Sequence, residues 1–390
     1  MENRYAVIIA GGRGERFWPL GRASRPKQFV DLFGGKPLIR IAAERLEGVV
    51  PPDHLFVVTS RDLVPATREA LPDLPPSQIV GEPFGRDTAA ACALGTELVA
   101  HHAQLAVSLQ AGNASINNSA PLREGGAPKG RGEPTLAILT ADQIMVDVDK
   151  FRRTLSDCFS IAESEPSIVT IGIEPTFPST GFGYIEAADR LDTGTETVFH
   201  AVQRFVEKPD ADTAAAYLAG GRHLWNSGMF LWGVRTFRDA LHRFQPALAA
   251  GFDALAPAIG APDFEERLEA FYNTLGKISV DYAIMEHADN IVMARGTFGW
   301  DDVGSWTAVP NHFPADADGN VAIGACETLD ASGNILLSRE EGHLVAVLGA
   351  KDLVVVHTKD ATLVCPRSEA PRLKTLVQQI GRRPDGARYL

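Results

Sequence analysis

Residues 5–29 read YAVIIAGGRGERFWPLGRASRPKQF, an apolar run that leads directly into a loop rich in glycines and cations. The apolar run, residues 5–10, is typical of a buried strand in a parallel sheet. Glycines in the loop allow a tight turn and bring backbone N–H groups close to an anion, and arginines and a lysine add positive charge. These residues are Gly11, Gly12, Gly14, Arg13, Arg16, Arg22, Arg25 and Lys27. The stretch therefore predicts a phosphate site that suits a nucleoside triphosphate.

Two common phosphate loops do not match this stretch. A dinucleotide-binding fingerprint needs a small residue three positions after Gly14, where Phe17 stands, and no GxxxxGK[ST] motif is near. Pro26 stiffens the chain before Lys27, which sets a second cation at a defined reach from the first. Taken alone, the loop remains either a phosphate cradle of another type or a plain tight turn.

The chain outward from this loop alternates short apolar runs with helical patterns, which is the pattern of βαβ units. Strands are expected at residues 55–60, 78–83, 135–142 and 167–173, and helices at 37–49, 61–71 and 86–102. Further strands after Gly181, with helices at 210–219 and 235–244, extend or flank the same sheet. We therefore expect an α/β fold with an open mixed, mainly parallel sheet flanked by helices, forming a catalytic domain over residues 1–310.

Two segments depart from this pattern. Residues 104–134 are expected to hold a flexible insertion, since the stretch 110–134 is rich in Gly, Asn, Ser, Ala and Pro and has no apolar period. Residues 311–390 contain short runs such as NVAIG, GNILLS and DLVVVHT separated by turn residues, and end in a helical pattern at 371–380. They predict a small C-terminal β-rich domain that resembles a solenoid with irregular rungs.

Composition limits the functional class. The chain has 390 residues, of which 45% are hydrophobic and 22% charged, and its net charge is −12. Such a charge disfavours a broad nucleic-acid or anionic-membrane surface, so no nucleic acid and no membrane are expected as partners. The four cysteines show no metal-ligand or CxxC spacing, and the first apolar run is too short for a signal peptide or a membrane span. We expect a cytoplasmic protein with reduced thiols.

Carboxylates at predicted strand ends are candidate metal ligands. Asp142 ends the strand at 135–142, and Asp302 lies beside Asp301 in GWDDVGSW. Mg²⁺ prefers one or two carboxylates together with phosphate oxygens, so Asp142 and Asp302 could hold it. A helix cap or solvated turn explains Asp142 equally well, and the sequence leaves open which of the two adjacent aspartates binds.

Two further motifs carry polar groups suited to a sugar phosphate. In FVEKP, Glu207 can accept hydrogen bonds from hydroxyls and Lys208 can neutralise a phosphate. In WNSGMF, Asn226 supplies an amide next to residues that permit close approach of the backbone. Each motif read alone is also an ordinary strand end or strand kink. No HExxH or GxSxG motif supports a hydrolase.

The order of eight motifs is more specific than any one of them. They are GGRGERFWPLGRASRPKQF, EPFGRDTAAA, TAD, TGFGYIE, FVEKP, WNSGMF, SVDYAIME and GWDDVGSW. In this order the chain resembles the sugar-phosphate nucleotidyltransferases, most closely members that use GTP and mannose 1-phosphate. The resemblance spans residues 5–306 and implies a nucleotide-binding α/β domain followed by a left-handed β-helical tail. The longer bifunctional members carry a further isomerase domain, for which the present sequence is expected to be too short.

The resemblance also implies roles for single residues. It assigns the nucleotide to Gly11, Gly12, Gly14, Arg16, Lys27, Glu82, Arg86, Asp87 and Thr88. It assigns the sugar phosphate to Gly183, Glu207, Lys208 and Asn226, and Mg²⁺ to Asp142 and Asp302. Two motifs depart from the family. The usual PADH is TADQ here, with Gln143 in place of histidine, and the usual GRNTAPA is GRDTAAA, with Asp87 in place of asparagine.

The implied reaction is transfer of GMP from GTP to mannose 1-phosphate, giving GDP-mannose and pyrophosphate. The acceptor phosphate is mostly a dianion at pH 7, because its second pKa is about 6, so no general base is required. Arg16, Lys27 and Lys208 would then act with Mg²⁺ by neutralising charge during in-line attack on the α-phosphorus. Alternatives are the same reaction on another triphosphate or hexose phosphate, and a catalytically silent sugar-nucleotide-binding regulatory protein. Strand edges in the tail are compatible with a homodimer.

Overall fold

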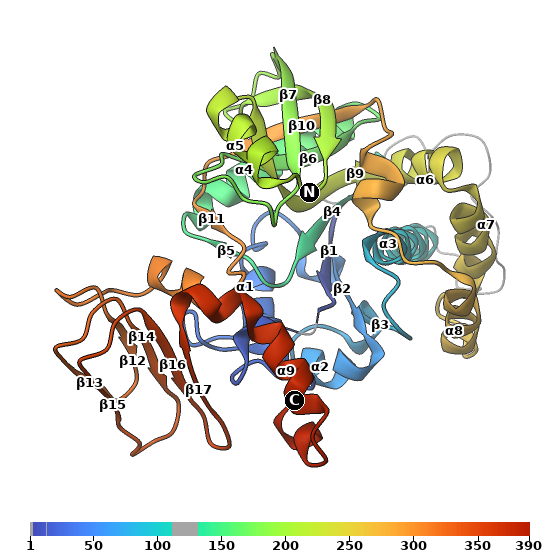
Figure 1. Cartoon of the computed structure of the whole chain (residues 1–390). Helices are drawn as coiled ribbons and strands as arrows, with labels where there is room; N and C mark the ends of the chain where they lie inside the picture. Colours follow the sequence, from blue (N-terminus) through green and yellow to red (C-terminus); the bar gives the residue numbers. More distant parts are fainter. Residues whose placement is uncertain (1–2, 13, 111–131) are drawn as a thin grey trace.

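A nine-stranded mixed sheet forms the centre of the molecule (Figure 1). The computed structural model describes residues 3–12, 14–110 and 132–390. Across the sheet the strands are β3 (Ile79–Glu82), β2 (Leu55–Ser60), β1 (Arg4–Ala10), β4 (Thr135–Thr140), β9 (His223–Gly233), β6 (Ile168–Ile173), β10 (Ile291–Gly296), β8 (Phe199–Val206) and β7 (Tyr184–Leu191). Within this described sheet β8 and β9 run opposite to the other strands. The expected open, mixed and mainly parallel sheet is confirmed.

Helices cover both faces of this sheet, because alternate residues of each buried strand present apolar side chains to opposite sides. One face packs against α3 (Thr88–Gln110), α6 (Val234–Phe244), α7 (Pro246–Leu255) and α8 (Phe264–Thr274). The other face packs against α1 (Leu38–Glu44), α2 (Val64–Ala70), α4 (Val148–Ser164) and α5 (Ala211–Gly220). The molecule is therefore a three-layer α/β structure whose loops at the strand ends are free to carry a site.

The helix α3 corrects the expected start of the insertion. The sequence predicts that this helix ends at residue 102 and that the insertion begins at about 104, but α3 continues to Gln110. Residues 104–110 read QLAVSLQ, which contains good helix formers and no glycine or proline, so the helix has no reason to stop there. Residues 111–131 of the predicted insertion lie outside the described residues, which continue from residue 132.

The C-terminal part is a coil of short strands, as the repeating apolar runs predict. Strands β12 (Val321–Ile323), β14 (Ile335–Ser338) and β16 (Leu353–His357) pair in parallel, and β17 (Thr362–Pro366) closes the sheet in antiparallel fashion. Strands β13 (Cys326–Leu329) and β15 (Val345–Leu348) form a second parallel pair. The chain thus alternates between two small sheets, as in a solenoid, before α9 (Leu373–Gly381). The division at residue 311 and the left-handed coil remain predictions.

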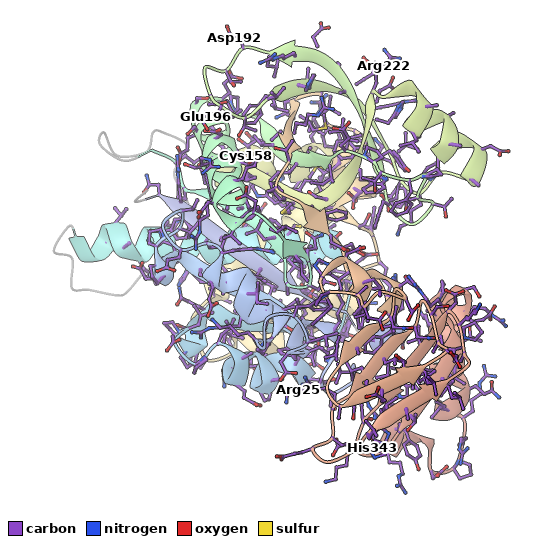
Figure 2. The ribbon with its side chains drawn as sticks, turned by 90° about the vertical axis from the view of Figure 1, so that its left-hand side faces the viewer. Arg25, Cys158, Asp192, Glu196, Arg222 and His343 are labelled. Atoms are coloured by element: carbon purple, nitrogen blue, oxygen red, sulfur yellow. The ribbon has the colours of Figure 1, made fainter. Side chains whose placement is uncertain are left out.

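The solenoid is joined to the glycine and cation loop by a continuous apolar cluster. Phe17 and Trp18 of the loop share this cluster with Trp306, Val354 and Val377. Figure 2 shows the two small sheets beside the main sheet, with Arg25 near their junction. The loop is therefore packed between the main sheet and the C-terminal coil.

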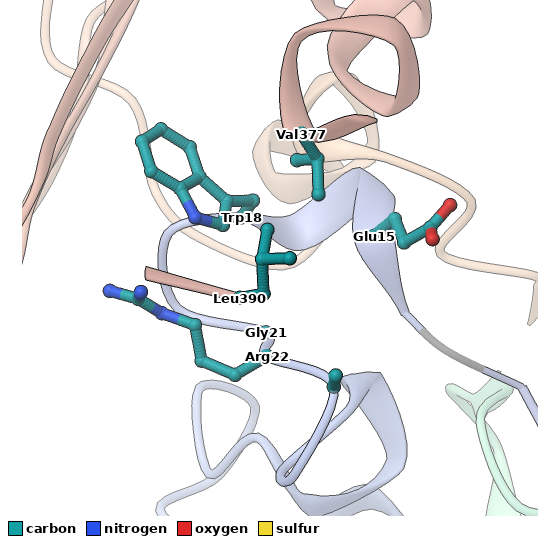
Figure 3. Close-up of a pocket in the computed structure, with 7 residues that line it drawn as sticks. Glu15, Trp18, Gly21, Arg22, Val377 and Leu390 are labelled. Carbon is teal, nitrogen blue, oxygen red and sulfur yellow. The ribbon is translucent and has the colours of Figure 1, made fainter. Parts of the chain in front are cut away.

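Hydrogen bonds reinforce this junction at its far end. The indole Nε1 of Trp18 donates to the backbone oxygen of Tyr389 at 2.7 Å, and Arg22 donates to the same oxygen. Arg22 also forms a 2.6 Å ion pair with Asp360. A small cleft between the loop and α9 is lined by Glu15, Trp18, Gly21, Arg22, Ala23, Val377 and Leu390 (Figure 3). Arg22, one of the cations that we expected near a phosphate, is thus bound to the C-terminal part.

Two further expectations concern the whole chain. All four cysteines are unpaired, with Cys92 and Cys158 buried and the other two partly exposed, which agrees with reduced thiols. No helix in the described part of the chain has the length and apolarity needed to cross a membrane.

Candidate functional site

The glycine loop follows β1, and its residue Gly14 lies against Lys27 of the same loop. Gly14 has a left-handed backbone with φ of 58°, and a Cβ atom there would overlap the backbone nitrogen of Lys27. Glycine is therefore required at this position, because any side chain would push apart two parts of the loop. Lys27 is almost completely buried, with 7% of its surface exposed. The sequence correctly anticipated that this lysine has a fixed position.

Lys27 lies between the two predicted metal-binding aspartates. Its Nζ donates to Asp142 Oδ2 at 3.1 Å and to the backbone oxygen of Asp302 at 2.5 Å. The guanidinium of Arg16 reaches the backbone oxygen of Gly304 at 3.4 Å, close to the Asp302 carboxylate. Two cations of the glycine loop therefore lie beside two aspartates from distant parts of the sequence. They are Arg16, Lys27, Asp142 and Asp302.

Local pairing of two short strands explains this convergence. Strand β5 (Ile144–Met145) follows Asp142, and β11 (Trp300–Asp301) precedes Asp302. The two strands pair in antiparallel fashion, with Trp300 opposite Met145. Residues 142–145 are thereby fixed beside residues 300–302.

The two adjacent aspartates have different roles. Asp301 accepts hydrogen bonds from Asn311, from the backbone of Val303 and at 2.9 Å from His312 Nε2. Although burial opposes it, the hydrogen bonds from His312 and Asn311 lower the pKa of Asp301. These bonds occupy Asp301 within the structure. The Asp302 backbone oxygen accepts from Lys27, and its carboxylate lies within the electrostatic reach of Lys27 and Asp142. This arrangement favours Asp302 over Asp301 as the candidate metal ligand.

The Asp302 carboxylate has properties that fit a metal ligand. Among the described residues no group donates a hydrogen bond to it or forms an ion pair with it. Burial raises its pKa, although the positive charges of Lys27 and Arg16 oppose this change. A buried carboxylate without a partner is unfavourable unless a cation or a donor completes it. The described residues contain no cluster of three or more acidic, histidine or cysteine side chains placed to hold a metal. Asp142 and Asp302 would therefore share a cation with substrate oxygens, the arrangement that Mg²⁺ favours.

The second predicted nucleotide segment begins at Glu82, the last residue of β3, and it contacts Tyr272. The Tyr272 hydroxyl donates to Glu82 Oε1 at 3.0 Å, and Arg86 Nε donates to the Tyr272 backbone oxygen at 2.8 Å. Burial raises the pKa of Glu82 to about 7, and repulsion from Asp87 acts in the same direction. Thr88 opens α3 and its hydroxyl accepts from the Val280 backbone N–H at 2.9 Å. Tyr272 carries no motif, so sequence reasoning missed it.

Asp87 has a left-handed backbone with φ of 69°. Its carboxylate accepts a hydrogen bond from the Thr88 backbone N–H at 2.8 Å. Aspartate tolerates this left-handed region better than most residues because its side chain can bond locally. The acid is therefore accommodated at the start of α3.

The predicted sugar-phosphate residues meet where β7, β8 and β9 come together. The Asn226 backbone N–H donates to Gly183 O at 2.8 Å, and a Cβ atom at Gly183 would overlap the Glu207 carboxylate. Lys208 is exposed and lies 3.3 Å from Glu207. The structure thus brings Gly183, Glu207, Lys208 and Asn226 together.

Asp281 completes this group and was not among the predicted site residues. The Asn226 side-chain amide donates to Asp281 Oδ1 at 2.7 Å. Burial raises the pKa of Asp281, and burial together with repulsion from Asp281 raises the pKa of Glu207. Two neighbouring carboxylates in a dry site favour a ligand with several hydroxyl donors. The motif SVDYAIME was the available signal for Asp281.

Comparison with known proteins gives the family. A family model described as "Nucleotidyl transferase" matches residues 5–319, and one described as "MannoseP isomerase/GMP-like beta-helix domain" matches residues 326–380. Mannose-1-phosphate guanylyltransferase of Escherichia coli K12 is 33% identical over 382 residues, covering 96% of this chain and 73% of that protein. Xanthan biosynthesis protein XanB of Xanthomonas campestris is 34% identical over 386 residues, covering 97% and 74%.

A solved structure agrees along the whole chain. The crystal structure described as mannose-1-phosphate geranyltransferase from Thermus thermophilus has a TM-score of 0.79 at 32% identity, covering 97% of this chain and 99% of that one. These matches include both the main sheet and the C-terminal coil. The protein therefore belongs to the nucleotidyl transferase family, among relatives named mannose-1-phosphate guanylyltransferase.

Proposed function

We propose that the protein transfers GMP from GTP to mannose 1-phosphate, releasing GDP-mannose and pyrophosphate. The observation that carries the proposal is the convergence of Lys27, Asp142 and Asp302 beside Arg16 at the end of the glycine loop. Cations and carboxylates gathered beside a glycine loop suit a triphosphate with its metal ion. The names of the relatives supply the choice of guanine nucleotide and mannose 1-phosphate.

The two substrates would occupy the two halves of the site. We assign GTP to the glycine loop and the segment after β3, through Gly11, Gly12, Gly14, Arg16, Lys27, Glu82, Arg86, Asp87 and Thr88. We assign mannose 1-phosphate to Gly183, Glu207, Lys208 and Asn226, with Asp281 added on the geometry above. Glu207 and Asp281 are suited to accept hydrogen bonds from sugar hydroxyls, and the exposed Lys208 to meet the sugar's phosphate.

Nucleotidyltransferases generally use a divalent metal ion, and we propose Mg²⁺ held by Asp142 and Asp302. When bound, the ion would neutralise negative charge on the triphosphate. Lys27 orients both aspartates through its two hydrogen bonds. Its own charge would offset charge that develops as pyrophosphate leaves.

The protein need not remove a proton in this reaction. The acceptor phosphate is mostly doubly ionised at pH 7, since its second pKa is about 6. One of its oxygens forms the new bond to the α-phosphorus while the bond to pyrophosphate breaks on the opposite side. Arg16, Lys27 and Lys208 would hold the two phosphates in line and reduce their mutual repulsion.

The decisive experiment measures pyrophosphate release from purified protein. GTP with mannose 1-phosphate should give the fastest release, dependent on Mg²⁺, in a panel of four triphosphates and several hexose 1-phosphates. Asp302→Asn should lose most of this activity. Faster pyrophosphate release with another triphosphate and sugar phosphate would contradict the proposed substrates and identify that pair instead. Thermal stabilisation by ligands without pyrophosphate release under any condition would instead identify a silent sugar-nucleotide-binding protein.

A further inference from the structure

The side chain of Gln143, next to the proposed metal site, forms hydrogen bonds to two other segments of the chain. Gln143 follows Asp142, and only 3% of its surface is exposed. Its Nε2 donates to the Ser227 backbone oxygen at 2.7 Å, and its Oε1 accepts from Trp300 Nε1 at 2.9 Å. The side-chain amide therefore connects the loop after β4 to both β9 and β11.

Each of these partners is next to a residue that we assign to a substrate or to the metal. Ser227 follows Asn226 of the proposed sugar site, and Trp300 lies two residues before Asp302. Gln143 itself follows Asp142. One buried amide thus joins the two segments that carry the proposed metal ligands to the segment that carries Asn226 of the proposed sugar site.

The backbone on both sides of Asp142 is fixed independently by Arg45. Its guanidinium donates to Gln143 O at 2.9 Å and to Thr140 O at 3.0 Å. Burial lowers the pKa of Arg45 to about 10, and nearby Asp142 opposes this change. Arg45 holds the turn, and the β5–β11 pairing holds it beside residues 300–302. The Gln143 side chain adds a bond to Trp300 and the bond that ties the turn to Ser227 of β9.

The two contacts require different chemistry. The Ser227 oxygen needs a donor, and the Trp300 indole N–H needs an acceptor. A primary amide offers both, whereas methionine offers neither of useful strength and an ionised glutamate offers only acceptors. A neutral imidazole also offers one donor and one acceptor.

We propose that Gln143 is a positioning residue that sets Asp142 relative to Asp302 and Asn226. The inference rests on the proposed function, since it concerns the geometry of that site. Misplacement of reacting groups by about 1 Å can cost about a hundredfold in rate. Loss of the amide should therefore act on catalysis and on metal affinity more than on GTP binding.

The principal test replaces Gln143 by methionine, which has a similar length but cannot bridge the two segments. Gln143→Met should lower kcat by at least about tenfold and leave the KM for GTP within about twofold. Calorimetric titration of Mg²⁺, with a GTP analogue blocked between the α and β phosphorus, should show weaker Mg²⁺ binding. This second measurement does not depend on turnover.

The control is Gln78→Met at a buried glutamine outside the proposed site. Gln78 is 4% exposed and donates to the Asp53 backbone oxygen at 2.6 Å. Gln78→Met should lower the unfolding midpoint by about as much as Gln143→Met does, and it should keep the wild-type kcat. Gln143→His, assayed at pH 8.5 where imidazole is neutral, should restore most of the kcat lost in Gln143→Met.

The outcomes separate the two proposals. Wild-type kcat and Mg²⁺ affinity in Gln143→Met would overturn the role of Gln143, and so would an equal loss of kcat in Gln78→Met. Absence of pyrophosphate release from the unaltered protein would overturn the proposed function instead. Should Gln143→Met not fold, Gln143→Glu keeps the shape and the acceptor but not the donor, and normal turnover in it would equally overturn the inference.

Discussion

Lys27 shows how one side chain organises the site. A buried ammonium is tolerated only with partners, and Lys27 has the Asp142 carboxylate and the Asp302 backbone oxygen. We predict that Lys27→Ala lowers kcat by about 10² to 10³, because a preorganised charge near the triphosphate is lost. Pyrophosphate release measures this. Lys36→Ala, which removes an exposed pair with Glu44, should leave kcat unchanged. A Lys27→Ala variant with normal turnover would contradict the assignment.

Glu82 predicts a pH dependence of stability. Its pKa is 4.5 in the unfolded chain and about 7 in the folded protein, so the folded state binds the extra proton between these values. Stability from this group is therefore complete below pH 4.5 and is lost as the pH rises through 7. Glu82→Gln removes this change, which amounts to at most about 3 kcal/mol. Denaturant unfolding of both proteins from pH 5 to 8 should show their stability difference shifting in favour of the variant. A constant difference would contradict the prediction.

Residue roles were predictable from the sequence only where a motif fixed them. The order of motifs identified Lys27 and Asp142, and the structure does bring them together. Between Asp301 and Asp302 the sequence could not choose, because the choice depends on His312, which only folding brings to Asp301. Gln143 looked like a departure from a family motif, yet both its amide nitrogen and its amide oxygen form hydrogen bonds.

At the scale of elements, the glycine loop depends on Gly14 for its shape. Gly14→Ala would require both a left-handed alanine and a shift of the Lys27 backbone. We predict a lower unfolding midpoint and a kcat reduced about as much as in Lys27→Ala, since the lysine would be displaced. The matched control is Gly220→Ala in α5, where a Cβ atom meets nothing within 4 Å. Equal behaviour of the two variants in the pyrophosphate assay would argue against a close fit between Gly14 and Lys27.

Element type was easier to predict than element ends. The strand at residues 55–60 lies where its apolar run places it, and α6 begins one residue before its predicted start. The strand predicted at 135–142 ends at Thr140, so Asp142 lies in the loop that follows β4. The predicted end of α3 was wrong, because the prediction gave more weight to the composition of the following stretch than to the helix formers at 104–110. Composition describes the average of a segment, whereas a helix ends only where a residue or a contact stops it.

At the scale of the whole molecule, the sequence indicated two parts but not how they join. The α/β pattern and the short β repeats were visible, and the apolar cluster between Phe17, Trp306 and Val377 was not. Phe17 is hundreds of positions from the other two residues in the sequence, and the three have no periodic relation. Only the packed structure shows that the glycine loop packs against the C-terminal coil.

The junction between the two parts can be tested through Arg22. Arg22→Met removes the ion pair with Asp360 and the bond to the Tyr389 backbone oxygen. We predict a several-fold higher KM for GTP and a lower unfolding midpoint, because the loop loses its support. Arg372→Met, which breaks an exposed pair with Glu369, serves as control and should change neither. An unchanged KM for GTP in Arg22→Met would show that the loop holds its shape without the junction.

The bonds from Trp18 and Arg22 to the Tyr389 backbone have a thermodynamic consequence. If docking of residues 386–390 increases the affinity of the loop for GTP by some factor, GTP must strengthen that docking by the same factor. Saturating nucleotide would then slow amide hydrogen exchange in α9 and in residues 386–390, far from any phosphate. The C-terminal coil would thereby report on occupancy of the nucleotide site.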